Sequence, residues 1–299
     1  MKIKNSMKKI YEKKIDDIDF KNRYQGKNFN ENWYTTIIDN NDDGYYNFNG
    51  KINVLFKFRK NVVPDKYRDT AIKSFLELSK KKHSNRGIAS GIPTGEKNAR
   101  HITPSGQSEG GYIASNISGY FDRPLREHRG ILGTIKACRT TAFTLNQYSL
   151  WKGGLVFIEY CSKLFKRFAP REWRIQQQEW ESINNSLKIP HTVFTTVTSN
   201  YNWRTACHCD AGDFSSGLGN LIVVGRDFSG GYLGFPQFKI LVKIKPGDFL
   251  LMDSHQWHCN TPIKLTDPSG FRLSFVMYIR EDMKGCQRKK VVENNVYFI

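Results

Sequence analysis

The sequence contains no apolar stretch long enough to cross a lipid bilayer, which requires about 20 consecutive, mostly apolar residues. Its lysine-rich start also lacks the apolar core that a secretory signal peptide needs. We therefore expect neither a membrane anchor nor a membrane partner.

Closely spaced cysteine pairs are absent as well. The six cysteines are scattered along the chain, and none of them forms the C-x-x-C pair that is typical of a structural zinc site. We expect an intracellular protein in a reducing compartment. The sequence carries no address that would distinguish the cytoplasm from a host cell or a nucleus.

Acidic residues are few compared with basic ones. The 46 lysines and arginines exceed the 28 aspartates and glutamates by 18. A phosphate backbone favours such a charge through counterion release, whereas an enzyme that acts on small molecules does not need it. An A·T-rich genome would also enrich the chain in lysine, and the charge alone does not choose between these explanations.

Apolar residues make up only 39% of the chain, but 20 Phe, 14 Tyr and 6 Trp supply bulky side chains for a sizeable core. We predict a basic N-terminal extension over residues 1–50 and one domain over residues 51–299. Within this domain, residues 82–119 show no periodicity and are predicted to form a long loop. The loop carries three basic side chains that could follow a nucleic-acid strand, Lys97, Arg100 and His101.

Hydrophobic periodicity predicts an α+β fold. Apolar residues at helical spacing predict helices over 64–81, 151–168 and 172–187, packed on the outside of a sheet. Extended patterns predict strands over 52–58, 139–144, 192–198, 220–224, 238–245, 249–252 and 271–280. Many short strands separated by Gly and Pro turns predict a double-stranded β-helix, or jelly-roll, core with flanking helices.

Candidate metal ligands lie in the second half of the chain. His208 and Asp210 are two residues apart, so their side chains point the same way on an extended segment. His255 and His258 follow near the end of a predicted strand, and one of them would complete the two imidazoles and one carboxylate of a mononuclear iron site. Such a site leaves open positions for a 2-oxo acid and O2.

An arginine follows these candidate ligands at a suitable place for a co-substrate. Arg272 and Ser274 share one face of a predicted strand, where a guanidinium and a hydroxyl can bind the same carboxylate. Each of these residues alone is a weak signal. Their joint order predicts an Fe(II) site that uses 2-oxoglutarate and O2.

Three runs of this sequence resemble the TET/JBP family of Fe(II)/2-oxoglutarate dioxygenases, which oxidise methyl groups of pyrimidine bases in DNA. The runs are Thr198–Asp213, Gly230–Pro236 and Lys245–Phe275, and weaker likeness extends upstream over Asn116–Arg123 and Cys138–Thr144. The chain lacks the cysteine-rich zinc-binding region of animal members. It therefore resembles the compact form found in protists and phages.

The resemblance implies roles for individual residues. In the family the distal metal ligand precedes Thr-Pro, which selects His258 and leaves His255 as a supporting residue. The metal ligands would be His208, Asp210 and His258. Arg272 and Ser274 would bind 2-oxoglutarate, with two further residues of the co-substrate or base pocket, Asn200 and Arg204.

The same resemblance implies a contact to the substrate base. Asp213 lies three residues after the metal-binding aspartate, where the family places a polar residue against the flipped base. A carboxylate there could accept a hydrogen bond from the exocyclic amine of cytosine. An aspartate that caps a turn would explain the same residue.

We therefore expect a dioxygenase that oxidises the C5-methyl group of 5-methylcytosine in DNA to 5-hydroxymethylcytosine, with the extent of further oxidation left open. The first alternative is the same oxygenase acting on thymine, on a protein or on a small molecule. A second is a non-catalytic, basic DNA-binding jelly-roll protein, although the complete ligand set argues against it. A cupin-type isomerase or metal hydrolase would have no need for Arg272. The expected partner is DNA with a methylated pyrimidine, and the oligomeric state is not predicted.

Overall fold

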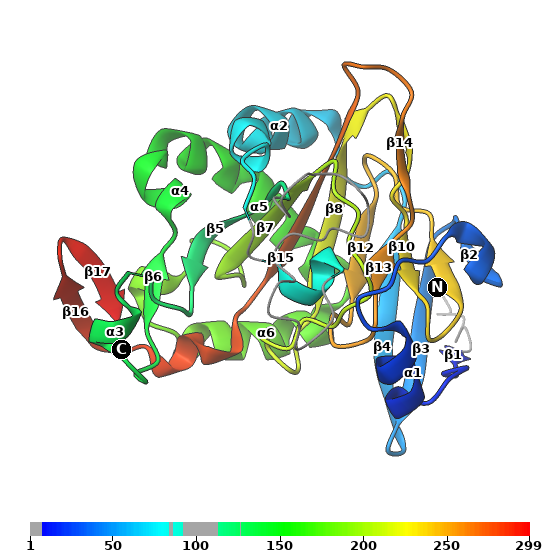
Figure 1. The fold of residues 1–299 in the computed structure, drawn as a ribbon, viewed down its shortest axis with the longest axis horizontal. Helices are drawn as coiled ribbons and strands as arrows, with labels where there is room; N and C mark the ends of the chain where they lie inside the picture. Colours follow the sequence, from blue (N-terminus) through cyan, green and yellow to red (C-terminus); the bar gives the residue numbers. More distant parts are fainter. Residues whose placement is uncertain (1–7, 84–85, 92–112, 126) are drawn as a thin grey trace, which may run out of the picture.

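The computed structural model describes residues 8–83, 86–91, 113–125 and 127–299 (Figure 1). The three basic residues singled out in the predicted loop, Lys97, Arg100 and His101, lie outside this part. The helices are α1 (Asp17–Tyr24), α2 (Asp65–Ser79), α3 (Arg129–Leu132), α4 (Ala142–Asn146), α5 (Tyr148–Phe168) and α6 (Pro170–Ser182). Short 3-10 turns are η1 (Glu31–Trp33), η2 (Gly87–Ser90), η4 (Asn185–Leu187) and η5 (Glu281–Gly285).

Two sheets face each other, and the predicted α+β jelly roll is confirmed. The larger sheet has the strand order β1-β3-β4-β12-β8-β15-β7-β5-β6-β17-β16, and the smaller has β13-β10-β11-β2. A two-stranded ribbon, β14-β9, completes the strands of the described part. Their bounds are β1 (Lys9–Tyr11), β2 (Thr36–Ile38), β3 (Asp42–Phe48), β4 (Lys51–Arg59), β5 (Ser115–Phe121), β6 (Cys138–Thr140), β7 (Thr196–Tyr201), β8 (Gly219–Arg226), β9 (Phe228–Gly230), β10 (Leu233–Phe235), β11 (Ile240–Val242), β12 (Phe249–Met252), β13 (Cys259–Asn260), β14 (Ile263–Leu265), β15 (Phe271–Tyr278), β16 (Lys289–Val292) and β17 (Asn295–Phe298).

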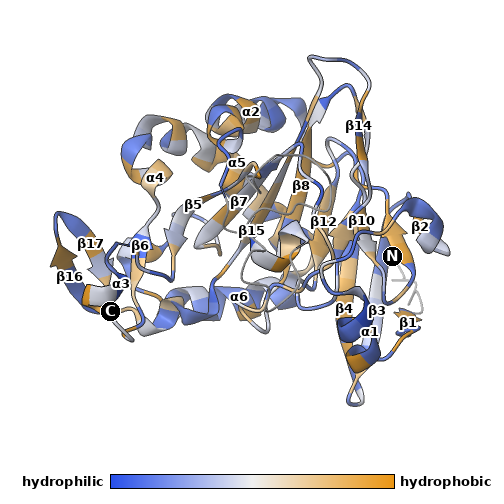
Figure 2. Cartoon of the chain, in the orientation of Figure 1, coloured by the Kyte–Doolittle hydropathy of each residue, from blue (hydrophilic) through white to orange (hydrophobic). Residues whose placement is uncertain are grey.

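The neighbouring strands β12 and β8 of the larger sheet are apolar on both faces. In β8, Leu221 and Val223 pack towards the smaller sheet, whereas Ile222 and Val224 pack towards the helices. Successive side chains of a strand point to opposite faces, so both faces of such a strand are buried. The hydropathy colouring shows these strands as a continuous apolar centre (Figure 2).

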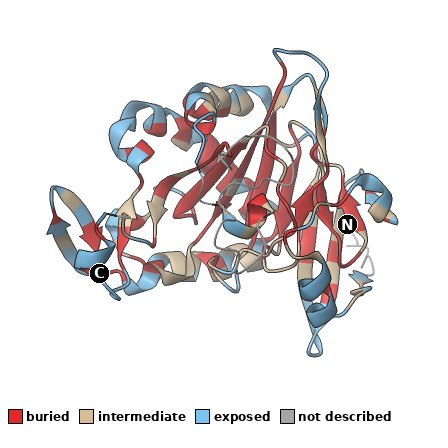
Figure 3. Cartoon of the chain, viewed as in Figure 1, coloured by how far each residue is buried: buried red, intermediate tan, exposed pale blue. Residues whose placement is uncertain are grey.

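The outer face of the larger sheet is covered by α2 and α5. Phe75 of α2 and Phe157 of α5 both contact Phe275 of β15, with ring centroids 5.4 and 5.1 Å apart. Gly154 lets the two helices approach, because a Cβ there would collide with the ring of Phe75. The inner halves of both helices are buried and their outer halves are exposed (Figure 3).

The helix α6 begins at Pro170, which suits the first helical position because its missing N–H would have no partner there. It contacts α5, and its Gln176 donates to the carbonyl of Val193 at 2.9 Å. The three predicted helices therefore form close to the expected ranges.

The N-terminal region differs from the prediction. Residues 8–50 are not a separate basic extension, because β3 pairs with β4 and β2 pairs with β11. Asn49 and Gly50, at the end of the predicted extension, form the turn that joins β3 to β4. Aromatic residues of this region, including Phe20, Phe29 and Tyr34, are buried, which explains why it packs on the domain.

Several predicted elements have different bounds, among them the strand predicted over 192–198, which begins at Thr196 and ends at Tyr201. The strand predicted over 139–144 ends at Thr140, and α4 begins two residues later. The strand predicted over 238–245 is reduced to Ile240–Val242. The predicted loop over 82–119 ends earlier, because β5 begins at Ser115 and pairs with β7.

Cys138 and Cys286 form a disulfide that links β6 to the C-terminal segment, whereas the sequence led us to expect reduced cysteines. The remaining four cysteines are free thiols. In the described part of the chain, no helix has the length and apolar character needed to cross a membrane.

Candidate functional site

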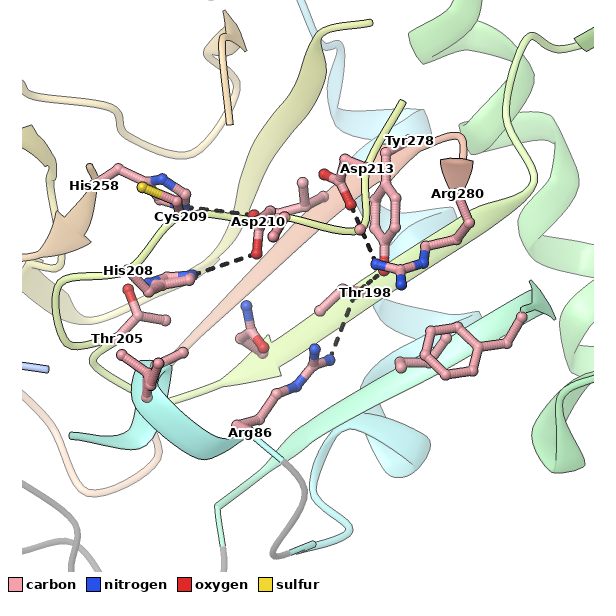
Figure 4. Close-up of a pocket in the computed structure, with 18 of the residues that line it drawn as sticks. Arg86, Thr198, Thr205, His208, Cys209, Asp210, Asp213, His258, Tyr278 and Arg280 are labelled. Atoms are coloured by element: carbon pink, nitrogen blue, oxygen red, sulfur yellow. Dashed lines mark hydrogen bonds and ion pairs between the residues drawn. The ribbon is translucent and has the colours of Figure 1, made fainter. Parts of the chain in front are cut away.

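A cavity of about 810 Å³ opens on the inner face of the larger sheet, beside β5, β7 and β15 (Figure 4). Its other walls come from the segment over 203–213 and from the segment that leads into β13. The period-two pattern of β15 explains its polarity. Leu273, Phe275 and Met277 fill the core on the helix side, so Ser274 and Tyr278 face the cavity.

Three of the cavity's side chains can hold a metal ion. The ligand atoms of His208, Asp210 and His258 all lie within 4.8 Å of one another. The Nε2 atoms of His208 and His258 are 3.6 and 3.5 Å from the two carboxylate oxygens of Asp210. Two imidazoles and one carboxylate on one face leave open positions for further ligands.

The backbone holds the two histidines in place. His208 and His258 form an isolated antiparallel bridge, with N–H to carbonyl distances of 3.1 and 3.0 Å. Each Nδ1 donates to a carbonyl two residues earlier, that of Ala206 at 2.8 Å and that of Gln256 at 2.9 Å. With Nδ1 carrying the proton, each Nε2 is free to bind a cation.

The charges of this triad are coupled. Burial, together with the neighbouring His258, lowers the pKa of His208 to about 4. Burial also opposes charge on His258, but the hydrogen bond and the charge of Asp210 outweigh it and raise the pKa of His258. The two histidines in turn hold the pKa of Asp210 below its usual range in spite of its burial. A neutral imidazole beside a carboxylate is the donor set that a divalent metal requires.

His255 lies outside this triad. Its Nδ1 is 3.2 Å from the carboxylate of Asp253, and its Nε2 is 3.3 Å from the backbone carbonyl of Asp213. The structure therefore brings His258 to the other two candidate ligands and places His255 behind Asp213.

Arg272 is almost fully buried beside the cavity, with 1% of its surface exposed. Its Nη1 donates to the hydroxyl of Ser274 at 3.1 Å, and Ser274 lines the cavity. The Nε and Nη2 groups have no partner within the described residues, and burial lowers the pKa of Arg272 to about 10. A buried guanidinium with unpaired donors fits a bidentate carboxylate such as that of a 2-oxo diacid.

The space for this guanidinium depends on Gly231. A Cβ at Gly231 would approach the Cδ of Arg272 to 2.7 Å, and the residue has a φ of +65°, which also favours glycine. Gly231, directly after β9, therefore makes room for the arginine.

Asn200 and Arg204 differ in their placement. Asn200 lines the cavity, and its side-chain oxygen accepts from Ser115 at 2.6 Å. Arg204 donates to the carbonyl of Asn260 at 3.1 Å and to that of Phe29 at 2.8 Å. The structure thus directs the Arg204 guanidinium to backbone carbonyls, away from the cavity where we expected it.

Asp213 lines the cavity next to the triad and is 7% exposed. Its carboxylate accepts from Ser254 at 3.0 Å, and its other oxygen is 3.6 Å from Arg280. Burial and the charge of Asp210 raise the pKa of Asp213 to about 8, against the opposing charge of Arg280. A bound divalent cation would favour the ionised form.

Sequence reasoning missed Arg280, Tyr278 and Arg86. Arg280 and Tyr278 lie at even offsets from Arg272, so the alternation of β15 could have placed them on the cavity face. Arg280 is fixed by Asp122, whose two oxygens accept at 3.1 and 3.2 Å. Arg86, which donates to Ser115 at 2.6 Å, comes from a stretch with no periodic signal.

A family model described as the oxygenase domain of the 2OGFeDO superfamily, Tet_JBP, matches residues 117–281, more than half of the chain. The thymine dioxygenase JBP1 of Crithidia fasciculata is 36% identical over 168 residues, which are 56% of this chain and 20% of that protein. JBP1 of Leishmania infantum is 34% identical over the same shares. The chain thus spans about a fifth of the length of these curated relatives.

One solved structure shares the fold. NgTET1 in complex with 5mC DNA has a TM-score of 0.52 and 16% sequence identity, and the match covers 83% of each chain. The match to the family model and the cavity described above agree on the class of protein. The chain belongs to the TET/JBP family of oxygenases and is an oxidoreductase whose cofactors are Fe(II) and 2-oxoglutarate.

Proposed function

We propose that this protein oxidises the C5-methyl group of 5-methylcytosine in DNA to 5-hydroxymethylcytosine. The observation that carries the proposal is a carboxylate, Asp213, that faces the same cavity as the triad of His208, Asp210 and His258. A carboxylate there accepts a hydrogen bond from the exocyclic amine of cytosine. The sharing of one cavity supports a base bound beside the metal.

In this proposal His208, Asp210 and His258 hold Fe(II), and the carboxylate of Asp210 supplies the negative ligand. Arg272 and Ser274 bind the far carboxylate of 2-oxoglutarate, and Asn200 contributes to the same wall of the cavity. When bound, Fe(II) with 2-oxoglutarate and O2 supplies the oxidant that inserts one oxygen atom into a C–H bond, with succinate and CO2 as co-products. The residues of the chain orient the substrate and exclude water.

The base must leave the helical stack to reach this cavity. Unstacking costs roughly a few kcal/mol, which contacts to the phosphate backbone can offset. Asp213 would orient the base through its exocyclic amine, with Ser254 and Arg280 holding the carboxylate in place. The net charge of +18 agrees with a polyanionic substrate.

The second candidate substrate is thymine in DNA. It is favoured by the relatives that are named thymine dioxygenases. The raised pKa of Asp213 also supports it, because a protonated carboxyl could donate to the O4 of thymine. An ionised carboxylate would instead repel this oxygen.

The test is anaerobic loading with Fe(II) and 2-oxoglutarate, exposure to air with duplex DNA that contains 5-methylcytosine, and nucleoside mass spectrometry. We expect one oxygen on 5-methylcytosine, dependent on iron and on 2-oxoglutarate. Oxygen on thymine alone would favour the second candidate. Iron binding without succinate from any substrate would contradict both.

A further inference from the structure

The cavity has a second wall that the proposed chemistry does not use. Phe121 at the end of β5, the loop over 123–125, Arg129 of α3 and Arg139 of β6 all line it. In Figure 1 β5, β6 and α3 lie to the left of β15, whereas β13, which follows His258 directly, lies to its right. Figure 4 shows the same separation inside the pocket, where Arg280 lies far from His258.

Three arginines of this wall differ from Arg280 in their ion pairs. No ion pair within the described residues includes Arg123, Arg129 or Arg139. Arg280 of the same cavity, by contrast, is bound by both oxygens of Asp122. A ligand at this wall would therefore not have to displace an ion pair of the described residues.

The local structure holds these arginines together. Arg139 is directly opposite Phe121 in the β5–β6 pair, and its Nε donates to the carbonyl of Arg123 at 3.0 Å. Arg139 is partly buried, and burial lowers its pKa, so its charge lacks the solvation that an exposed arginine has. An anion near Arg139 would restore that stabilisation.

Exposure shows where the cavity opens. Arg123 and Arg129 are exposed although they line the cavity, whereas His258 at the metal is buried. Arg123 and Arg129 consequently lie at the mouth, and Arg139 lies beside Arg123, to whose carbonyl it donates. A nucleotide whose base enters the cavity is joined to its strand by a phosphate on each side, and these phosphates remain at the mouth.

We propose that Arg123, Arg129 and Arg139 form an arginine rim that binds the backbone phosphates flanking the inserted nucleotide. The inference rests on the proposed function, because it requires a nucleic-acid strand as the substrate. The planar fork of arginine suits phosphate oxygens, and such contacts fix the register of a strand without reading its sequence. The rim would therefore set affinity and position, while Asp213 would set the choice of base.

The experiment measures DNA affinity at several KCl concentrations in the absence of iron, so that no turnover occurs. The probe is a fluorescent duplex that contains 5-methylcytosine. The variants are Arg123→Gln and Arg129→Gln, singly and together, and a triple variant with Arg139→Gln. Arg171→Gln is the matched control, because Arg171 is exposed on α6 and does not line the cavity.

Each phosphate contact that is lost should lower the slope of log affinity against log salt by roughly 0.9, or about eightfold in affinity at 0.1 M salt. We expect this loss for the rim variants and an unchanged slope for the Arg171 control. Arg129→Lys, which keeps the charge, should retain most of the slope. Arg123 and Arg129 are exposed, so their double variant tests the proposal even if Arg139→Gln destabilises the fold.

The outcomes separate the rim from the function. Equal slopes for the rim variants, the control and the unmodified protein would overturn the rim, while the mass-spectrometric test of base oxidation would be unaffected. If the Arg171→Gln control lost as much of the slope as the rim variants, the effect would come from net charge alone, and the rim would again be overturned. If the unmodified protein binds no DNA and oxidises none, both the rim and the proposed function are wrong.

Discussion

The two ends of the cavity are built in different ways. At the metal end, His208 and His258 are each fixed by a backbone bridge and by a second hydrogen bond through Nδ1. At the mouth, Arg123 and Arg129 are exposed, and no ion pair in the described ranges holds them. Hydrogen bonds therefore fix the geometry of the metal end. The charged side chains at the mouth are exposed and can adjust their position.

This difference agrees with what each end would have to do. Placing three ligand atoms around one cation requires an accuracy of a fraction of an ångström, which supporting hydrogen bonds provide. Binding a flexible, regularly charged strand requires charge and reach more than fixed geometry. Substitutions at the metal end should therefore abolish turnover almost completely. Substitutions towards the mouth should reduce binding or selectivity by smaller factors.

The largest effect is expected for His258→Ala, with His255→Ala as its matched control. Removal of a metal ligand should cost more than the roughly 10–100-fold that is typical for residues behind the ligands. His255 contacts Asp253 and the carbonyl of Asp213, so its loss should leave metal binding largely intact. Succinate formation and anaerobic iron titration would check this. Loss of iron in His255→Ala with retention in His258→Ala would reverse the ligand assignment.

The second effect concerns the co-substrate. Arg272→Lys keeps a positive charge but removes the fork whose Nε and Nη2 have no partner within the described residues. A hydrogen bond to a charged group contributes about 1.5–3 kcal/mol, so 2-oxoglutarate should bind roughly 10–150-fold more weakly. Calorimetric titration with a redox-inert metal would measure this. Arg226→Lys, on an exposed residue of β8, is the control, and equal affinities in the two variants would argue against the role of Arg272.

A smaller effect is expected at Asp213, between the two ends. Asp213→Ala should reduce the preference for 5-methylcytosine over thymine by about tenfold, since a base-edge contact contributes roughly 1–3 kcal/mol of discrimination. Competition between the two bases, followed by nucleoside mass spectrometry, would show it. Asp267→Asn in an exposed turn is the control. If activity and base preference are both unchanged in Asp213→Ala, this residue does not contact the base.

The smallest effect is expected for thermal stability. Backbone hydrogen bonds join His208 to His258, so we expect Mn²⁺ to stabilise the fold by mass action alone, by about 2.7 kcal/mol at 100 times its dissociation constant. For a chain of this size that corresponds to a rise in Tm of about 5 °C. Asp210→Asn should abolish the rise. Unfolding of the whole chain on metal removal would contradict a preformed site.

Several strands of the larger sheet could be predicted from the sequence, and β15 carries part of the site. The bounds of β12 match the range predicted over 249–252. The strand β15 ends two residues before the end of the range predicted over 271–280. The N-terminal strands could not be predicted, because β3 is polar in pattern and β2 pairs with the distant strand β11. Tertiary pairing outweighs local propensity there.

The candidate site shows the same division. The order of His208, Asp210, His258 and Arg272 along the chain was enough to predict them as a group, and the structure brings the first three together. Arg204 was misplaced because the carbonyl groups that it binds belong to segments that no local pattern could locate. The arginine rim lacked a signal for the same reason, since the β5–β6 pairing creates it.

The disulfide between Cys138 and Cys286 closes a loop across 148 positions of the chain. This loop contains the metal triad, Asp213, Arg272 and Arg139, whereas Arg123 and Arg129 lie outside it. A protease that cuts once inside the loop would therefore leave the pieces of the metal end covalently joined until a reductant is added. A cut between Arg129 and Cys138 would instead separate two arginines of the rim from the third.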